Sequence, residues 1–298
     1  MLIRAGYIIG FECPAPTPMI LMLSVRPERR HDLVTPDAIR STPSTRLRAY
    51  RDNFGNACHR LIAPEGRTNF HADFLIRDSG LPDEAAPLAI QHPVDELPDE
   101  TLVYLLGSRY CETEPLQDLA WSLFGSTRPG WPRVQAIVDY VHDRLTFGYE
   151  NARATRTARE AHAEQVGVCR DFAHLAIALC RCMNIPARYC TGYLGDIGVP
   201  ALPSPMDFSA WFEVFLGGRW RTFDARHGAP RIGRILMARG RDATDAAITT
   251  AFGRADLATF KVVTEEVPED TIAYGPSAWR AGDSPGEDRL GAAVASAR

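Results

Sequence analysis

The segment Gln165–His174 holds the residues whose types and spacing best suit nucleophilic chemistry. Gly167 permits a sharp turn, and the apolar spacing after it predicts a long helix with Cys169 in its first turn. Backbone N–H groups at a helix start lack partners within the helix, and they lower the pKa of a thiol placed there. A thiolate in that position is a nucleophile. A core cysteine close to a helix start is the alternative interpretation at this point.

A second segment, 206–227, predicts a β-hairpin with polar groups on one face. Gly217 and Gly218 suit a two-residue turn, which fixes the register of the flanking strands. Trp211 then faces Asp224 and Ser209 faces Arg226, and paired residues point to the same side of a sheet. The polar face would carry Ser209, Trp211, Glu213, Thr222, Asp224 and Arg226, and the more apolar face Phe208, Phe212, Val214, Phe223 and His227.

Four motifs in this order resemble the bacterial transglutaminase-like superfamily. They are Gly167-Val168-Cys169-Arg170-Asp171, Pro186-Ala187-Arg188-Tyr189, Ala210-Trp211-Phe212-Glu213 and Trp220-x-x-Phe-Asp224. The first hundred residues are similar to the β-rich N-terminal domain that accompanies this core in bacteria. The resemblance implies a papain-like core, in which helices pack on an antiparallel sheet.

The resemblance also implies roles for particular residues. Cys169 would be the nucleophile that forms a thioester, position 209 the base, and Asp224 the residue that orients the base. The implied function is cysteine-dependent acyl transfer from a peptide, protein or small amide. Transfer to water, as in a protease or amidase, is favoured over crosslinking to an amine. No metal or organic cofactor is implied.

Position 209 departs from the family pattern His-Ala-Trp, because this chain has Ser209-Ala210-Trp211. A serine hydroxyl has no basicity near neutral pH, so it cannot take the thiol proton as an imidazole does. In a first interpretation another histidine substitutes. His227 is the nearest candidate, but strand alternation points it to the opposite face unless the strand ends after Asp224. His174 lies about 140° around the helix from the thiol.

Two further interpretations stay open. In the second, the thiol works through the helix dipole and a nearby arginine, with water or substrate carrying the proton. In the third, the chemistry is impaired or lost and the cleft only binds. Arg226 would suit an anionic ligand in either case, and Trp211 is the other predicted cleft residue.

Other candidates are weaker. Cys180 and Cys182 point about 200° apart on the predicted helix, and neither they nor Cys190 have the spacing of a metal site. The Arg-rich stretch 231–242 could contact an acidic substrate, but a solvated loop and strand is the favoured interpretation.

The surrounding pattern predicts an α+β fold. Short apolar runs before residue 100 predict an antiparallel β domain, a sandwich or open barrel, with residues 79–100 as its surface linker. Helical spacing follows over 136–145 and 168–183. Strands are then predicted at 187–193, 210–216, 219–224 and 260–266, all within a core of residues 101–275. Residues 276–298 are expected to be a disordered tail.

Composition argues against several classes of function. The chain has 298 residues, 45% of them hydrophobic, and a formal net charge of −4, which argues against a nucleic-acid partner. Lys261 is the only lysine, so lysine Schiff-base chemistry has one candidate in a segment with no catalytic pattern. No apolar run approaches the ~18 residues of a membrane helix, and no secretory signal is evident. We therefore expect a cytoplasmic location, free cysteines and no membrane partner, and leave association between copies open.

Overall fold

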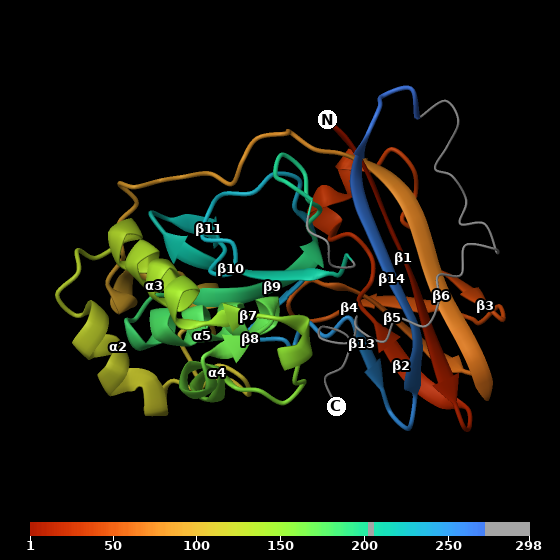
Figure 1. Ribbon diagram of the computed structural model, residues 1–298, viewed down its shortest axis with the longest axis horizontal. Coiled ribbons are helices and arrows are strands. Elements are labelled where there is room, and N and C mark those ends of the chain that lie inside the picture. The colour runs from red at the N-terminus through yellow and green to blue at the C-terminus, as the bar shows by residue number, and fades with distance from the viewer. Residues whose placement is uncertain (202–205, 272–298) are drawn as a thin grey trace.

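The computed structural model describes residues 1–201 and 206–271. A β-sandwich occupies one side of the molecule and helices packed on a third sheet occupy the other (Figure 1). The predicted α+β class is confirmed. No helix in the described part is both long enough and apolar enough to cross a bilayer.

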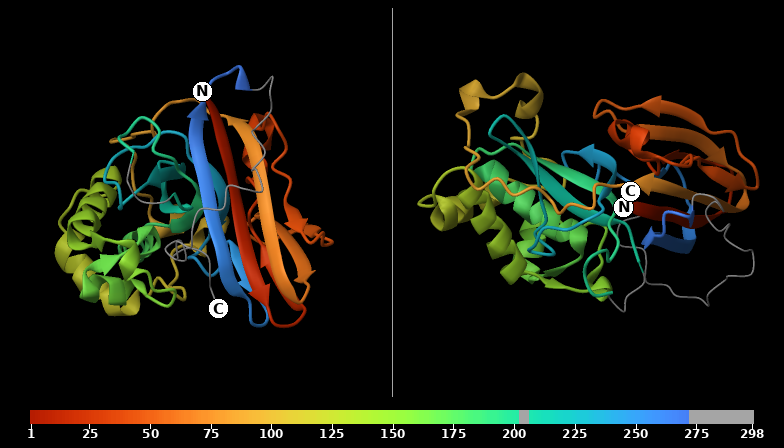
Figure 2. Two further views of the ribbon diagram at one scale, coloured as in Figure 1. Left: turned by 45° about the vertical axis from the view of Figure 1, so that its right-hand side comes forward. Right: turned by 90° about the horizontal axis from the view of Figure 1, so that it is seen from above.

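The sandwich consists of two four-stranded antiparallel sheets. The first has the order β14 (Asp256–Val267), β1 (Leu2–Cys13), β6 (Gly66–Arg77) and β3 (Arg40–Thr42). The second has the order β13 (Thr249–Ala251), β2 (Thr17–Leu21), β5 (Ala57–Ala63) and β4 (Arg48–Arg51). Alternate side chains of the inner faces, such as Tyr7, Met19 and Phe70, are buried in one core. Figure 2 shows the two sheets as separate layers.

The last two described strands belong to the sandwich and not to the core. The strand predicted at 260–266 lies in β14, which pairs with β1 from Leu2↔Val267 to Glu12↔Asp256. Likewise β13 pairs with β2. The expected core range 101–275 therefore contains two strands that complete the N-terminal sheets. The reason is that β1 is largely buried and needs a hydrogen-bonding partner at each edge, and β14 supplies the second one.

The core sheet has the order β11 (Arg219–Phe223), β10 (Ser209–Leu216), β9 (Ala187–Tyr193) and β12 (Ile235–Gly240). The predicted two-residue turn is confirmed, with Gly217 and Gly218 at φ of 58° and 79° and Phe212 opposite Phe223. A short parallel pair, β7 (Thr146–Phe147) and β8 (Val166–Gly167), lies before the main helix.

Helix α5 (Cys169–Cys182) is the centre of the core, and every one of its residues is buried. A helix that is enclosed on all sides can carry apolar residues all round. It ends where Asn184 takes a left-handed conformation, two residues before Pro186. Around it lie α2 (Gln117–Phe124), α3 (Trp131–Arg144) and α4 (Ala158–Glu164). The remaining short helices are η1 (Pro27–Asp32), η2 (Val94–Glu96), α1 (Asp99–Leu102), η3 (Glu114–Leu116) and η4 (Tyr149–Asn151).

The two units share an aromatic junction directly before β10. The ring of Phe208 contacts Tyr7 of β1, Tyr193 of β9 and Phe260 of β14, with centroids 5.0–6.1 Å apart. Aromatic pairs of this geometry bury large apolar area and hold defined orientations. The start of β10 is therefore fixed by both units, which matters because the candidate site lies there.

Candidate active site

Cys169 is the first residue of α5, as the sequence predicts. The chain enters the helix through Val168, whose backbone N–H donates to Asp171 Oδ2 at 2.9 Å. Asp171 Oδ2 also accepts from Arg156 Nη1 at 3.1 Å. This buried carboxylate closes the helix start and holds the thiol in position.

The thiol is enclosed, with only 2% of Cys169 exposed. Burial raises its pKa to about 12, although Arg226 and the backbone N–H of Ala210 both act to lower it. The expectation of a lowered pKa is therefore wrong, because burial of the thiol is the largest influence on it and raises it. The thiol is protonated near neutral pH, so any reaction requires a group that takes its proton.

Ser209 begins β10, opposite Gly192 of β9. It is buried, and its hydroxyl has no hydrogen-bond partner within the described residues. The next residue is Ala210, whose backbone N–H acts to lower the pKa of the Cys169 thiol. Position 209 thus directly precedes a residue that acts on the thiol, but the side chain it carries has no basicity.

Asp224 lies in a turn and not in a strand, because β11 ends at Phe223. Its Oδ1 accepts from the backbone N–H groups of Arg226 at 3.0 Å and His227 at 3.1 Å. A carboxylate that bonds to the backbone two and three residues later competes with the sheet ladder. The predicted strand pairs Trp211 with Asp224 and Ser209 with Arg226 therefore do not form.

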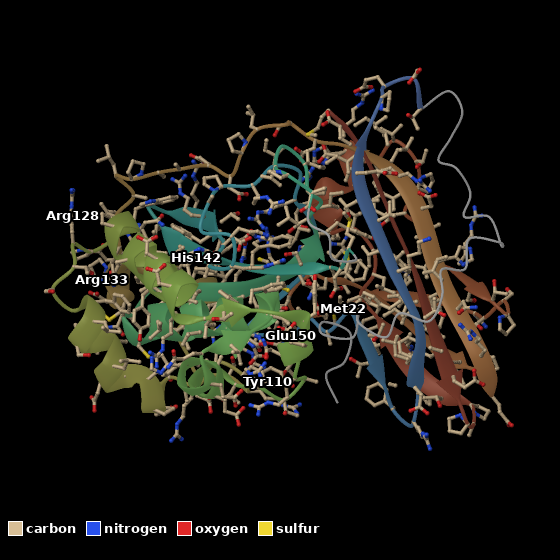
Figure 3. All side chains as sticks on the ribbon, viewed as in Figure 1. Met22, Tyr110, Arg128, Arg133, His142 and Glu150 are labelled. Carbon is tan, nitrogen blue, oxygen red and sulfur yellow. The ribbon has the colours of Figure 1, made fainter. Side chains whose placement is uncertain are left out.

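This turn brings His227 onto Asp224, with Nδ1 2.8 Å from Oδ2. Because β11 ends at Phe223, strand alternation no longer directs the His227 side chain to the opposite face of the sheet. None of the hydrogen bonds that His227 makes in the described structure reaches Cys169. His142 of α3, labelled in Figure 3, fixes the same turn through Nδ1 and the carbonyl oxygen of Ala225, 3.1 Å apart.

Arg234 gives Asp224 its charge partner, with Nη2 2.9 Å from Oδ2. Burial alone would raise the pKa of Asp224, but Arg234 and His227 hold it well below its usual range. Arg234 also pairs with Asp83 at 2.9 Å. The solvated interpretation of the Arg-rich stretch is wrong at this residue, because Arg234 is buried between two carboxylates.

Arg226 and Trp211, the two predicted cleft residues, lie in different surroundings. The Arg226 guanidinium stacks on Phe147 of β7 at 3.8 Å, and its charge acts on the Cys169 thiol. Trp211 is 2% exposed and packs with Cys190 and Leu236, a placement typical of a core residue. A role for Trp211 in a substrate cleft stays a prediction.

Asp207 is the residue that sequence reasoning missed. It lies two positions before β10 and is 7% exposed, and neither carboxyl oxygen has a hydrogen-bond partner in the described structure. Burial raises its pKa to about 8, and its charge acts on the Cys169 thiol. The one signal in the sequence is an acidic residue between Met206 and Phe208, at the start of a buried strand.

The described residues contain no group of three or more His, Cys, Asp or Glu side chains placed to hold a metal ion. The seven cysteines are all free thiols. Cys180 and Cys182 lie inside α5, and Cys190 packs against Trp211.

Comparisons with known proteins match this architecture. A family model described as the transglutaminase-like superfamily matches residues 118–225, a range that contains Cys169 and Asp224 and ends before His227. An uncharacterized protein of Mycobacterium leprae is 35% identical over 83 residues, which are 27% of this chain and 30% of that relative. The matched segment is thus under a third of that relative's length.

One solved structure extends the likeness over 91% of this chain. The crystal structure of a protein from Cytophaga hutchinsonii, described as a putative cysteine protease, is 31% identical with a TM-score of 0.77, covering 91% of this chain and 92% of that one. The periplasmic domain of TgpA from Pseudomonas aeruginosa is 17% identical, with a TM-score of 0.37 over 73% of this chain and 72% of that one. With the family motifs on α5, β9, β10 and β11 and a full-length likeness at 31% identity, this chain belongs to the transglutaminase-like superfamily.

Proposed function

We propose that this protein is a cysteine-dependent hydrolase in which Cys169 forms a thioester with a peptide, protein or small amide substrate. The observation that carries the proposal is the placement of the buried Cys169 as the first residue of α5, where the Ala210 N–H acts to lower the pKa of its thiol. A nucleophile beside free backbone donors is the arrangement that acyl transfer requires.

The proposed reaction uses the backbone N–H groups at the start of α5. The Cys169 sulfur attacks the amide carbonyl carbon, and the carbonyl oxygen becomes an oxyanion near the first-turn N–H groups of α5. The thiol proton passes through a water molecule to the nitrogen of the departing amine as the bond forms. Water then attacks the thioester, which releases the acid and returns the proton to sulfur.

Hydrolysis suits this site better than crosslinking. Cys169 is enclosed, so water reaches the thioester more easily than a lysine side chain of a second protein. The chain itself offers Lys261 as its one lysine, on β14 of the sandwich. The seven free cysteines favour a reducing compartment, and we include a cytoplasmic location in the proposal.

A binding protein that has lost the reaction is the second candidate, and Ser209 is the residue that favours it. A serine in the family's histidine position gives the thiol no base, and a lost triad member can lower the rate by several orders of magnitude. This candidate predicts ligand binding without turnover.

The two candidates separate in one experiment. Hydrolysis of 4-nitrophenyl acetate and of a panel of aminoacyl 4-nitroanilides is measured for the parent, Cys169→Ala and Cys13→Ala, whose thiol lies in the distant strand β1. We expect turnover by the parent and Cys13→Ala, and none by Cys169→Ala. Equal turnover by all three proteins would contradict the proposal, and absence of turnover in the parent would favour the binding protein.

A further inference from the structure

The outer face of the second sandwich sheet carries an open groove with a volume of ≈1050 Å³. The inner face of this sheet points into the core, where Met19 and Leu61 are buried. The groove is lined by side chains that alternate with these along β2 and β5, among them Ile20, Arg60 and Ile62. Both views in Figure 2 place β2, β4 and β5, drawn in red and orange, apart from the green helices of the core. No described residue of the groove belongs to α5 or to the core sheet, so it lies outside the candidate active site.

Strand pairing arranges the groove side chains in two neighbouring rows. In one row, Arg60 of β5 stands directly opposite Arg48 of β4. In the next row, Pro18 of β2 stands opposite Ile62 of β5, and the backbone N–H of Phe252 donates to the Pro18 carbonyl oxygen at 2.9 Å. Ile62 and Phe252 are 59% and 62% exposed. Side chains two residues apart on a strand share one face, so a cationic row lies beside an exposed apolar row.

Three arginines of the groove have no counter-charge in the described structure. Arg46, Arg48 and Arg60 are exposed, and none of them forms an ion pair with a described residue. No described residue that lines the groove is acidic. Exposed arginines elsewhere, such as Arg219 and Arg254, do pair with carboxylates. In a chain of net charge −4, this groove is therefore a local positive patch, and it is kept although like charges on facing positions destabilise a sheet.

We propose that this groove binds an acidic peptide segment of a partner protein, in which carboxylates alternate with apolar side chains. A guanidinium group binds a carboxylate through two parallel hydrogen bonds, which suits Arg48 and Arg60. Exposed apolar side chains beside them, such as Phe252, are covered when the peptide lies in the groove. This inference goes beyond the proposed function and does not depend on it.

The free edge of the sheet favours a peptide over a lipid. Strand β4 is the last strand of its sheet, and all four of its residues are exposed. An edge strand presents backbone N–H and C=O groups that a peptide can pair with, whereas a lipid cannot pair with both. Arg48 and Tyr50 of β4 line the groove, so the groove reaches this edge. A bilayer surface is flat on this scale, whereas an extended peptide can follow a concave surface.

The test measures binding by the full-length protein of a fluorescein-labelled octapeptide in which glutamate and leucine alternate, by fluorescence anisotropy. Two matched peptides carry glutamine for glutamate, or serine for leucine. The parent is compared with Arg60→Thr and Phe252→Ser. Arg128→Thr and Leu88→Ser are the control variants. Figure 3 shows Arg128 at the end of the molecule away from the sandwich, and Leu88 is 81% exposed in the segment between β6 and α1.

We expect Arg60→Thr to raise the dissociation constant of the acidic peptide ~5-fold and Phe252→Ser to raise it ~10-fold. The two matched peptides should bind the parent at least ~10-fold more weakly, and added salt should weaken binding of the acidic peptide. Both control variants should bind like the parent. Arg60→Thr should also raise the midpoint of urea unfolding, because it removes the repulsion with Arg48. A variant that merely damaged the fold would lose both binding and stability.

Four results would overturn the inference. The first is no binding of the acidic peptide by the parent at up to ~1 mM peptide. The second is equal binding of the glutamate and glutamine peptides, or equal binding by the parent and Arg60→Thr. The third is tighter binding to vesicles of phosphatidylcholine and phosphatidylserine that the same variants abolish, which would assign the groove to a membrane surface.

The fourth is a dimer, measured by sedimentation, that Arg60→Thr dissociates, which would assign the groove to a second copy of this chain. None of these measurements involves turnover or Cys169. Failure of this inference therefore leaves the proposed hydrolase standing, and failure of the hydrolase leaves this inference standing.

Discussion

His227 Nδ1 lies 2.8 Å from Asp224 Oδ2 in the turn that follows β11. The histidine and the aspartate of this site are thus three residues apart in one turn, and not on neighbouring strands as the family pattern implies. The same carboxylate is neutralised by Arg234. This arrangement fixes the turn whose Arg226 acts on the Cys169 thiol.

Asp224→Asn should destabilise the fold by about 3 kcal/mol, because it leaves Arg234 buried with Asp83 as its one carboxylate partner. The pKa of Asp224 is lowered in the folded state, so the unfolded chain binds a proton first as the pH falls. The stability supplied by Asp224 is therefore present above about pH 4 and lost below it. Urea unfolding at neutral and acidic pH checks both effects, with Asp139→Asn as control. An unchanged unfolding midpoint at neutral pH would show that Arg234 needs no second partner.

His174→Gln should flatten the pH dependence of stability below neutral pH. His174 lies inside α5, and its Nε2 accepts from the Ala243 N–H at 3.1 Å. Burial, with Arg170 and Arg181 nearby, holds the pKa of His174 well below its usual range despite the opposing charge of Asp242. The unfolded chain takes up this proton near pH 6.5 and the folded chain does not, so stability falls as the pH decreases.

The expected difference between parent and His174→Gln is about 1 kcal/mol in the change of unfolding free energy from pH 6.5 to pH 5.5. Urea titrations at the two pH values measure it. Identical slopes in the two proteins would mean that the folded protein also protonates His174.

Ser209→Ala should stabilise the fold by about 0.5–1 kcal/mol. The Ser209 hydroxyl is buried without a partner in the described structure, and alanine removes the unsatisfied polar atom while leaving the backbone of β10 intact. Thermal unfolding of the two proteins, with Ser122→Ala on the exposed side of α2 as control, measures the difference. A loss of stability would mean that the Ser209 hydroxyl forms a hydrogen bond that stabilises the fold.

Arg60→Thr should stabilise the sandwich by about 0.5 kcal/mol, because Arg60 of β5 stands directly opposite Arg48 of β4. Both side chains are exposed, and neither forms an ion pair within the described residues. Arg60→Lys keeps the charge and should leave stability unchanged. The gain should shrink at high salt, where exposed charges are screened. A gain that is equal at low and high salt would point to strand propensity and not to charge.

Much of the core could be predicted from local patterns. The apolar spacing after Val168 predicts α5, and the pair Gly217-Gly218 predicts the register of β10 and β11, because both depend on residues close together in the chain. The placement of Cys169 at the helix start follows from Gly167 and that spacing.

The missed features depend on contacts between distant segments. The pairing of β14 with β1 joins residues 244 to 265 positions apart, and alternation within β14 does not identify its partner. The end of β11 at Phe223 depends on the bonds that Asp224 makes to the following backbone. The burial of Asp207 and of Cys169, which raises the pKa of both, depends on packing between segments far apart in the chain, which no short motif records.

The central claim is that Cys169 carries the acyl group, and the most direct measurement is peptide mapping by mass spectrometry after rapid acid quenching of a reaction with 4-nitrophenyl acetate. The account predicts an acetyl group on the peptide containing Cys169, formed and lost at the rate of turnover, and no such adduct on the other six cysteines. Steady turnover with no acetyl group on Cys169, or with the adduct on another residue, would contradict it.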